Sequence, residues 1–532
     1  MRFVRCLLFL IFVLVAAVSF AQIKEDWLPV TPQDLSYKEV PGKPGASAVR
    51  LYYAHSIDNN SQTEFIYERI KVLKDKGKEY ADVKIPIFSS DIFFVTLSDL
   101  KARTIRPDGS IVEFTDKVFN TVIFKGQGLR LFAKGFTLPE VSVGSIIEYK
   151  YHLNFQVPVA YAAFVLDLGG DWVMQSDLHT VRENFYFRPY EGGVYQSTTH
   201  AHVEWDGAQV SWVSTNMKDK PKSKGNEISM EMQNVPAFDS EDHMPPEDNY
   251  KPTVIFFYTR RGTGNTEKAW QDIGQDANER IETFIAKNRG VKEAALKAMA
   301  DETEPGMKLR RLYERALQIR NLSFEHFRSE EEMKKENLQQ NIGAGDVLAH
   351  GYGTDRDITR LFVAMARAAG FEASILLTSD RKERFFNKEE TSLRQINSMI
   401  ASVVLDGKEI YLEPGTKFCP YGLVRWNHTL TDALKLDRKG GVFVKIPPSN
   451  YDKSVIHRTA NATVAEDGSL KGEVIVEYKG YDALEHRLES LDNDEAGKKK
   501  MLEDELKEWL PSGSVVKMAK MCDLFDRATD WC

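Results

Sequence analysis

The sequence predicts an α+β multidomain protein, and three observations support this fold class. The first half reads as short strands separated by turns, without the helical crossovers that parallel strands need. Helical periodicity then runs from about residue 267 to residue 320. After residue 354, one amphipathic helix is followed by strands of alternating polarity. We expect an antiparallel β-sandwich over residues 46–260, an α+β core over 263–446 and a small β/α region over 452–532.

The first 21 residues read as a signal peptide. Arg2 and Arg5 precede an apolar run from Leu7 to Val18, and the small-residue site Ser19-Phe20-Ala21 follows. The run is too short for a comfortable transmembrane anchor, and no later stretch is apolar for long enough to cross a membrane. We therefore expect an exported protein, periplasmic or secreted, that begins at Gln22 and has no membrane span after cleavage.

Charge and cysteine content narrow the function classes. Losing the two arginines of the signal changes the formal net charge from -8 to -10, so nucleic-acid binding has no electrostatic basis. Cys419, Cys522 and Cys532 remain after cleavage and allow at most one disulfide. Their spacing indicates neither a metal site nor a cofactor site, and we expect none.

The predicted sandwich rests on alternation and turns. From Ile147 to Phe155 every second residue is apolar, which is typical of a half-buried strand. Asp108-Gly109 and Asp206-Gly207 mark turns between such runs. The charged stretch Lys218 to Lys224 is most simply a solvated loop, with a binding role as the alternative.

Three helices are expected before the centre of the core, over Glu267–Lys287, Val291–Ala300 and Gly306–Arg320. The first carries an apolar stripe at helical spacing, which is more often core than a ligand site. The stripe consists of Trp270, Ile273, Ala277, Ile281 and Phe284.

A glycine-flanked turn leads into the helix around which the core is organised. Thr354 is a plausible N-cap, and Asp357 three residues later fits a capping box. Apolar residues then recur three and four apart until Gly370, and Phe371 to Thr378 reads as a buried strand. Asp355 therefore lies in the first turn, where proteins place anionic groups, including catalytic thiolates.

A hairpin is expected after this strand. Alternation up to Leu405, the turn Asp406-Gly407 and the return through Leu412 set a register in which Leu405 pairs with Lys408. Ile400 then faces Glu413, and Ser398 faces Gly415. Ser398 and Glu413 become diagonal neighbours roughly 7–8 Å apart at the backbone, a geometry that suits a base and an orienting carboxylate.

The run G-Y-G-T-D-R-D from Gly351 to Asp357 resembles the core of transglutaminase-like proteins of the papain-type superfamily. Their pattern, G-x-G-D-C-x-D before an apolar helix, carries the nucleophilic cysteine. The resemblance covers roughly residues 265 to 430, and it implies that Asp355 stands at the cysteine position. By the same resemblance, Ser398 takes the place of the histidine and Glu413 that of the aspartate.

The N-terminal half also resembles a known kind of domain, through the P-D-G turn at 107–109, the P-x-V-x-x-G-S-I-I-E-Y run at 139–149 and the M-P-P element at 244–246. It is similar to the β-rich domain of unknown function that often precedes transglutaminase-like cores in exported bacterial proteins.

The inferred triad positions argue against acyl transfer. A carboxylate attacking an amide would form a high-energy anhydride, and serine has no useful basicity for accepting a proton. Glu413 in place of aspartate is the mild change, because the acid remains and only its reach differs.

Other constellations give weaker signals. His350, Asp357 and Glu413 could form a carboxylate-rich metal site, but a surface histidine, a helix cap and a salt bridge explain them equally well. Cys419 does not begin a helix, so we expect it to pack in the core. His326 and His428 are isolated histidines without a signal of their own.

The C-terminal region predicts a second hairpin and a helical segment. Val455 to Val464 and Leu470 to Tyr478 flank Asp467-Gly468, and Tyr481 to Leu510 reads as a charged helix or helix pair broken near Asn493. Few strands are left to complete a sheet, so either this region is small or the sequence is cut short.

The leading hypothesis is a catalytically inactive transglutaminase-like protein that acts as a binding or scaffold module in the cell envelope. We expect a net-negative cleft for an extended peptide, a protein or a cell-wall polymer, although a closed crevice is the competing possibility. Its expected residues are Tyr352, Asp355, Asp357, Ser398 and Glu413. The alternatives are a peptide- or glycan-directed hydrolase or acyltransferase with a non-standard site in the same cleft, and a purely structural protein.

Overall fold

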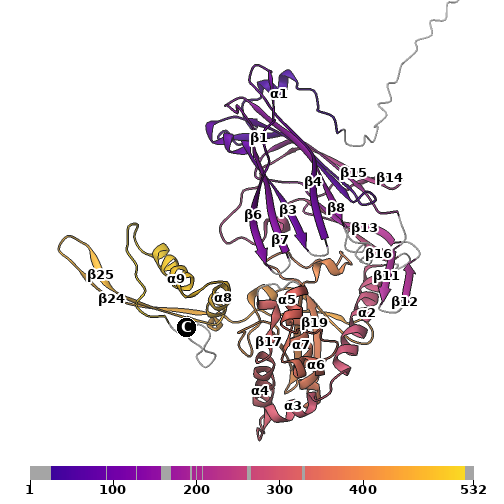
Figure 1. Cartoon of the computed structure of the whole chain (residues 1–532), viewed down its shortest axis with the longest axis vertical. Helices are drawn as coiled ribbons and strands as arrows, with labels where there is room; N and C mark the ends of the chain where they lie inside the picture. The colour runs from indigo at the N-terminus through magenta and orange to yellow at the C-terminus, as the bar shows by residue number, and fades with distance from the viewer. Residues whose placement is uncertain are drawn as a thin grey trace, which may run out of the picture.

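A computed structural model describes residues 25–90, 93–126, 129–156, 169–191, 194–198, 201–205, 208–260, 265–325 and 330–521. Figure 1 shows a β-rich N-terminal domain at one end, a mixed α/β core at the other and a C-terminal region that projects from the side of the core. The fold is therefore α+β and multidomain, as predicted. Within the described residues, no helix is both long and apolar enough to span a membrane. The expected signal peptide lies outside them.

The N-terminal domain is built on an 11-stranded sheet. Its strands, in their order across the sheet, are β14 (Lys222–Lys224), β15 (Glu227–Val235), β10 (Thr180–Arg188), β1 (Ala48–Asp58), β2 (Thr63–Val72), β8 (Ile146–Gln156), β4 (Phe93–Ile105), β3 (Asp82–Ser90), β7 (Leu129–Thr137) and β6 (Phe119–Gly126), with β5 (Ile111–Glu113) paired to β4. The pairing is antiparallel except between β1 and β10. That parallel pair departs from the expected sandwich, because β10 follows β1 only after the long excursion through β2–β9.

A smaller sheet covers part of the large one. It consists of β13 (Ala208–Thr215), β16 (Thr253–Arg260) and β9 (Gly170–Val173). Trp172 of β9 and Phe256 of β16 pack with Phe185 and Phe187 of β10, and the Phe187 and Phe256 rings stack 4.0 Å apart. This aromatic layer is the sandwich-like part of the domain. A separate hairpin joins β11 (Val194–Thr198) to β12 (Ala201–Trp205), and the short helix α1 (Pro32–Ser36) precedes the first strand.

Helices of the core surround one buried helix, α7 (Asp355–Ala368). Those that pack on it are α2 (Thr266–Ala286), α3 (Val291–Met299), α4 (Pro305–Leu317) and α6 (Ala344–His350). Three of these match the expected helices, and the stripe on α2 is buried as predicted, with Ile273 at its edge. Short elements fill the connection, namely β17 (Arg320–Asn321), α5 (Glu330–Lys335) and β18 (Tyr352–Gly353).

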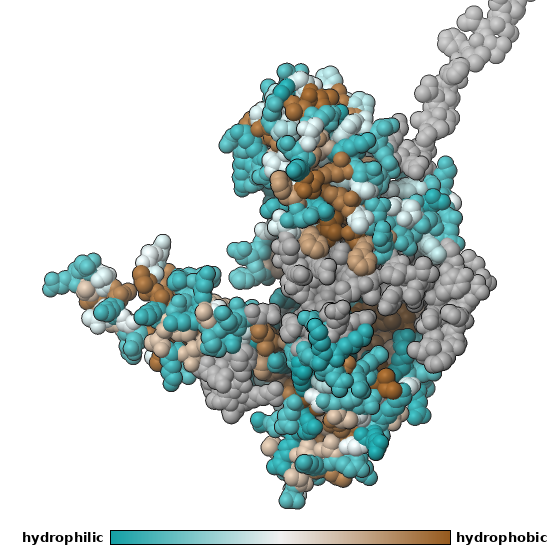
Figure 2. Space-filling model, in the orientation of Figure 1, coloured by the Kyte–Doolittle hydropathy of each residue, from teal (hydrophilic) through white to brown (hydrophobic). Residues whose placement is uncertain are grey.

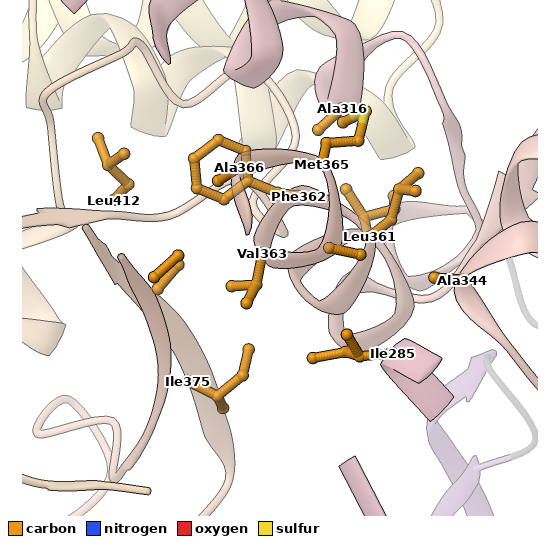
Figure 3. Close-up of a cluster of buried hydrophobic side chains, with 14 of the residues drawn as sticks. Ile285, Ala316, Ala344, Leu361, Phe362, Val363, Met365, Ala366, Ile375 and Leu412 are labelled. Carbon is orange, nitrogen blue, oxygen red and sulfur yellow. The ribbon is translucent and has the colours of Figure 1, made fainter. Parts of the chain in front are cut away.

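The other side of α7 packs on a five-stranded antiparallel sheet. Its order is β21 (Lys408–Leu412), β20 (Ser398–Leu405), β19 (Ala373–Thr378), β22 (Asp432–Lys435) and β23 (Val442–Lys445). Figure 3 shows Phe362 and Val363 of α7 between the helices and the strand residues Ile375 and Leu412. Burying an apolar side chain of this size stabilises the fold by about 1.5–3 kcal/mol. Helix α7 is thus packed on both sides, by helices and by the sheet.

The C-terminal region contains the second predicted hairpin, β24 (Val455–Val464) and β25 (Leu470–Lys479). Helix α8 (Tyr481–Glu489) and helix α9 (Glu495–Trp509) follow, separated near Asn493 as expected. Leu484 of α8 packs with Cys419 and Leu423 of the core. The hairpin itself projects away from the core (Figure 1).

Candidate functional site

The start of α7 has the predicted cap. The Thr354 hydroxyl accepts a hydrogen bond from the Asp357 N–H, and the Asp357 carboxylate accepts one from the Thr354 N–H, both at 3.2 Å. This capping box confirms the geometry expected from the sequence and satisfies two backbone donors. Asp357 also forms an ion pair with Arg360 at 3.6 Å. Both the cap and this ion pair give Asp357 a structural role at the helix start.

Asp355 occupies the first turn of α7, half-buried. The Ser323 hydroxyl donates to its Oδ1 atom and accepts its backbone N–H, each at 3.0 Å. Ser323 lies in the segment just after α4, and the sequence did not predict a role for its hydroxyl group. One carboxylate oxygen of Asp355 is therefore engaged with a neighbouring loop.

The loop that carries Glu413 lies against this first turn. Gly415 allows the contact, because a Cβ atom there would sit 2.5 Å from the Asp355 carbonyl oxygen and 2.6 Å from Thr359 Oγ1. Asn321 donates to the Gly415 carbonyl oxygen at 2.8 Å. The fold thus brings the Asp355 turn and the Glu413 loop together, as the resemblance implies.

Ser398 is the first residue of β20. The predicted hairpin register is present, because Leu405 pairs with Lys408 and Ala401 with Leu412. Strand β21 ends at Leu412, before the positions expected to face Ile400 and Ser398. The Ser398 hydroxyl donates to Asn397 Oδ1 at 3.1 Å, so its hydrogen bond goes to its own neighbour in the chain.

Glu413 lies below the surface, with only 2% of the residue exposed. Its carboxylate accepts hydrogen bonds from Arg425 Nε at 2.7 Å, from the Arg425 backbone N–H at 2.9 Å and from the Thr416 hydroxyl. His428 Nδ1 is 3.1 Å from Glu413 Oε1, and this residue too is 2% exposed. The imidazole thus lies directly beside the carboxylate, although the alignment at Nδ1 is not that of an ideal hydrogen bond.

These partners decide the charge of Glu413. Burial alone would raise the pKa of its carboxyl group, but the charges of His428 and Arg425 and the hydrogen bonds to the carboxylate outweigh burial. The pKa of Glu413 is therefore held below its ordinary range. The expectation that Asp355 and Glu413 together line one negatively charged slot needs correction here, because the Glu413 carboxylate is buried and its charge is balanced by Arg425 and His428.

Arg425 and His428 follow Glu413 by 12 and 15 residues, and no pattern in the sequence predicts a role for either. An irregular loop and the short 3-10 turn Trp426–His428 bring both side chains back to Glu413. Such a loop has no helical or strand periodicity from which the contact could be predicted. The only available signal was a histidine and an arginine close to the predicted acid position.

The other expected positions have local roles. Tyr352 accepts the Gln339 N–H at 2.6 Å and stacks on His350 at a centroid distance of 5.3 Å. His350 Nδ1 lies 2.7 Å from Asn341 Oδ1. His350, Asp357 and Glu413 thus have separate partners, and in the part of the chain that the structure describes no group of three or more potential ligands could hold a metal ion.

Cys419 packs in the core, as its sequence context suggests. It is fully buried, burial raises the pKa of its thiol, and its Sγ atom lies 3.3 Å from the Leu423 carbonyl oxygen. Tyr313 of α4 donates to the carbonyl oxygens of Glu413 and Cys419, at 3.1 and 3.0 Å. A cavity of about 760 Å³ between the core and the C-terminal region is lined in part by Tyr313 and Cys419, and not by Asp355, Ser398 or Glu413.

Two family models match the chain. Residues 58–239 match a domain of unknown function with solved structures, DUF3857, and residues 297–408 match the transglutaminase-like superfamily. The chain combines a DUF3857 domain with a transglutaminase-like domain. No curated protein matches it. A similar solved structure, described as a "putative protease" from Parabacteroides distasonis ATCC 8503, is 13% identical, covers 76% of this chain and 72% of that chain, and has a TM-score of 0.48.

The chemistry open to this site follows from its groups. The transglutaminase-like domain presents a carboxylate at the helix start, a hydroxyl at the head of β20 and a buried, paired acid. A carboxylate and a hydroxyl can bind amide groups and cations, but neither activates a nucleophile in the way that a neutral imidazole activates a thiol.

Proposed function

We propose that this chain is an exported protein whose transglutaminase-like domain lacks cysteine-type acyl transfer and acts as a binding or scaffold module in the cell envelope. The observation that carries the proposal is the engagement of Glu413. A triad acid holds the base that activates the nucleophile, whereas the Glu413 carboxylate is bound by Arg425, Thr416 and His428, and Ser398, at the expected base position, donates to Asn397 instead.

The other two positions support the same conclusion. Asp355 is bonded to Ser323, and Ser398 donates to Asn397, so neither forms the nucleophile–base contact that acyl transfer needs. The one thiol in the described residues, Cys419, is fully buried and its pKa is raised, which removes it as a substitute nucleophile.

Activity assays test the proposal. The wild-type protein should show neither peptide hydrolysis nor amine incorporation that iodoacetamide inhibits, and Asp355→Ala should change no rate. Asp355→Cys/Ser398→His places the missing groups in the intact framework and serves as the positive comparison. A wild-type activity that Asp355→Ala abolishes would overturn the proposal.

A hydrolase or acyltransferase acting on peptide or glycan is the second candidate, and one observation favours it. His428 and Glu413 form a histidine–carboxylate pair at 3.1 Å, the arrangement that general bases use. Both residues are 2% exposed, so this candidate requires the loop that carries His428 to open. Activity that survives Asp355→Ala but is lost in His428→Gln would support it.

Binding in the cleft is the positive half of the proposal. Asp355 is the acid that remains accessible at the start of α7, so basic peptides and amide-rich cell-wall fragments are the expected ligands. Titration followed by NMR should shift resonances near Asp355 and Ser398, and Asp355→Ala should weaken binding. Glu293→Gln, which alters an exposed acid on α3, is the matched control. Ligands that perturb no residue near Asp355 would leave only the scaffold role.

Export is tested separately. Mass spectrometry of the periplasmic or secreted product should find Gln22, or the pyroglutamate formed from it, as the first residue. A cytoplasmic product that retains Met1 would exclude export.

A further inference from the structure

The β24–β25 hairpin has one apolar and one polar face. Residues directly opposite each other share a face, and the pairs Val464–Leu470, Ala462–Gly472 and Ala460–Val474 lie on the apolar one. Val464, Leu470 and Val474 are 66%, 65% and 39% exposed. Figure 2 shows hydrophobic side chains at the surface of this projecting region. Two strands that expose such a face are marginally stable alone.

Helices α8 and α9 cover only the base of the hairpin. Arg458 lies over the Trp509 ring, and the Tyr478 hydroxyl donates to Glu505 at 2.9 Å. His486 of α8 packs edge-on against Tyr478. The hairpin residues in these contacts, Arg458 and Tyr478, lie in the half of the hairpin nearer the core. The half nearer the turn is not covered by the two helices, and its apolar side chains are exposed.

The outer edge of β25 is unpaired within the described residues. The Ala465 N–H donates to the Ser469 carbonyl oxygen at 2.9 Å, so this pair next to the turn is hydrogen-bonded. Along the two strands, hydrogen-bonded pairs then alternate with pairs that are not hydrogen-bonded to each other. The residues whose N–H and C=O groups point away from β24 are therefore Leu470, Gly472, Val474, Val476 and Tyr478. In the part of the chain that is described, their backbone groups bond to no other element.

We propose that a second copy of this chain pairs with β25 along this edge, antiparallel and about a twofold axis at Val474. The two hairpins then form one four-stranded sheet with a continuous apolar face. Val474 meets its own copy, Gly472 meets Val476 of the second copy, and Leu470 meets Tyr478 of the second copy. Five pairs of outward-facing residues supply about ten inter-strand hydrogen bonds.

Charge selects this register. On the polar face, Lys471 lies opposite Glu477 of the second copy, and the symmetry repeats this ion pair. Glu477 already approaches His457 at 3.1 Å within its own hairpin, so the incoming lysine completes a small cluster. Glu473 lies opposite Ile475 of the second copy, which is neutral.

Neighbouring registers are worse. A twofold axis at Ile475 places Lys471 opposite Lys479 and Glu473 opposite Glu477, which repel. An axis at Glu473 places that carboxylate opposite its own copy. Axes at Gly472 and Val476 also place a lysine opposite a glutamate, but each keeps only three of the five hydrogen-bonded pairs. Strand β24 presents His457, Thr459, Asn461 and Thr463 on its polar face and has no charge pattern to fix a register.

Sedimentation velocity of the full chain at about 1–200 µM tests the proposal, because a small strand interface gives a weak, concentration-dependent dimer. We expect Lys471→Glu and Glu477→Lys each to weaken dimerisation by about tenfold or more. The double variant Lys471→Glu/Glu477→Lys reverses both ion pairs and should restore it. Glu473→Lys makes the same charge change as Glu477→Lys, but at a position that faces isoleucine, and should change dimerisation little.

A backbone variant tests the edge itself. Val474→Pro removes an N–H that points outward, so it should abolish the dimer while circular dichroism and the β24–β25 pairing stay intact. A chain that stays monomeric at the highest concentration would overturn the proposal. So would a dimer that is indifferent to both charge reversals, or open-ended oligomers, which indicate β24 pairing with β25 of the next copy.

Discussion

Two buried glutamates, one in each large domain, respond to burial in opposite ways. Glu183 on β10 is 1% exposed, and burial raises its pKa to about 7 despite the opposing charge of Arg50. Glu413 in the transglutaminase-like domain is 2% exposed, yet its pKa is held below the ordinary range because His428 and Arg425 outweigh burial. Burial thus leaves one carboxyl group only partly ionised near pH 7, whereas the other is fully ionised.

Their partners explain the difference. Arg50 already forms an ion pair with Glu68 at 3.2 Å, so its positive charge is divided between two carboxyl groups. Neither oxygen of Glu183 makes a well-formed hydrogen bond. Glu413 has a guanidinium, a backbone N–H, a hydroxyl and an imidazole around it. The transglutaminase-like domain therefore holds a negative charge at Glu413, whereas the β-rich domain tolerates at Glu183 a carboxyl group that ionises reluctantly.

Glu413→Gln should have the largest effect. Removing the charge leaves the half-buried Arg425 and the buried His428 without their counter-ion, and breaking a buried ion pair typically costs about 3–5 kcal/mol of folding free energy. Hydrogen exchange of peptides from the transglutaminase-like domain should report that loss at pH 7. The double variant Glu413→Gln/Arg425→Gln should recover part of it, because fewer unpaired charges stay buried.

The pH dependence of this loss has a definite sign. Because the pKa of Glu413 is lowered in the folded protein, its stabilisation is present above its unfolded pKa of about 4.3 and is lost as pH falls through the folded pKa. The stability difference between wild type and Glu413→Gln should therefore shrink below about pH 4. A difference that is constant down to pH 3 would contradict the assigned charge.

Glu183→Gln should change stability in the opposite direction. A folded pKa of about 7 means that the wild-type carboxyl group loses stability as pH rises from its unfolded pKa through 7. Glutamine avoids this penalty, so the variant should gain roughly 1–3 kcal/mol at pH 8 and little at pH 5. Hydrogen exchange of β10 peptides at both pH values measures the effect. An equal change at both would mean that packing, rather than ionisation, distinguishes the two side chains.

The sequence predicted the framework of the core better than its electrostatics. The cap at Thr354, the helix behind it and the Leu405–Lys408 register depend on local periodicity and turn chemistry, and the structure has all three. The Arg425 and His428 contacts depend on an irregular loop that returns to Glu413, and the β1–β10 pairing depends on strands more than a hundred residues apart. Neither leaves a periodic pattern in the chain, so sequence reasoning placed the acid but not what surrounds it.

Asp355→Ala should have the smallest effect. Asp355 interacts favourably with the positive end of α7 and accepts the Ser323 hydroxyl, but it is half-buried and its loss leaves the Thr354–Asp357 cap intact. A first-turn carboxylate is worth about 0.3–1 kcal/mol, so the variant should lose no more than that. Thr354→Ala removes the cap itself and should cost more, about 0.5–2 kcal/mol. Urea unfolding of Asp355→Ala and Thr354→Ala measures both losses. If Asp355→Ala lost as much stability as Glu413→Gln, the first turn of α7 would hold a buried, paired charge like that of Glu413.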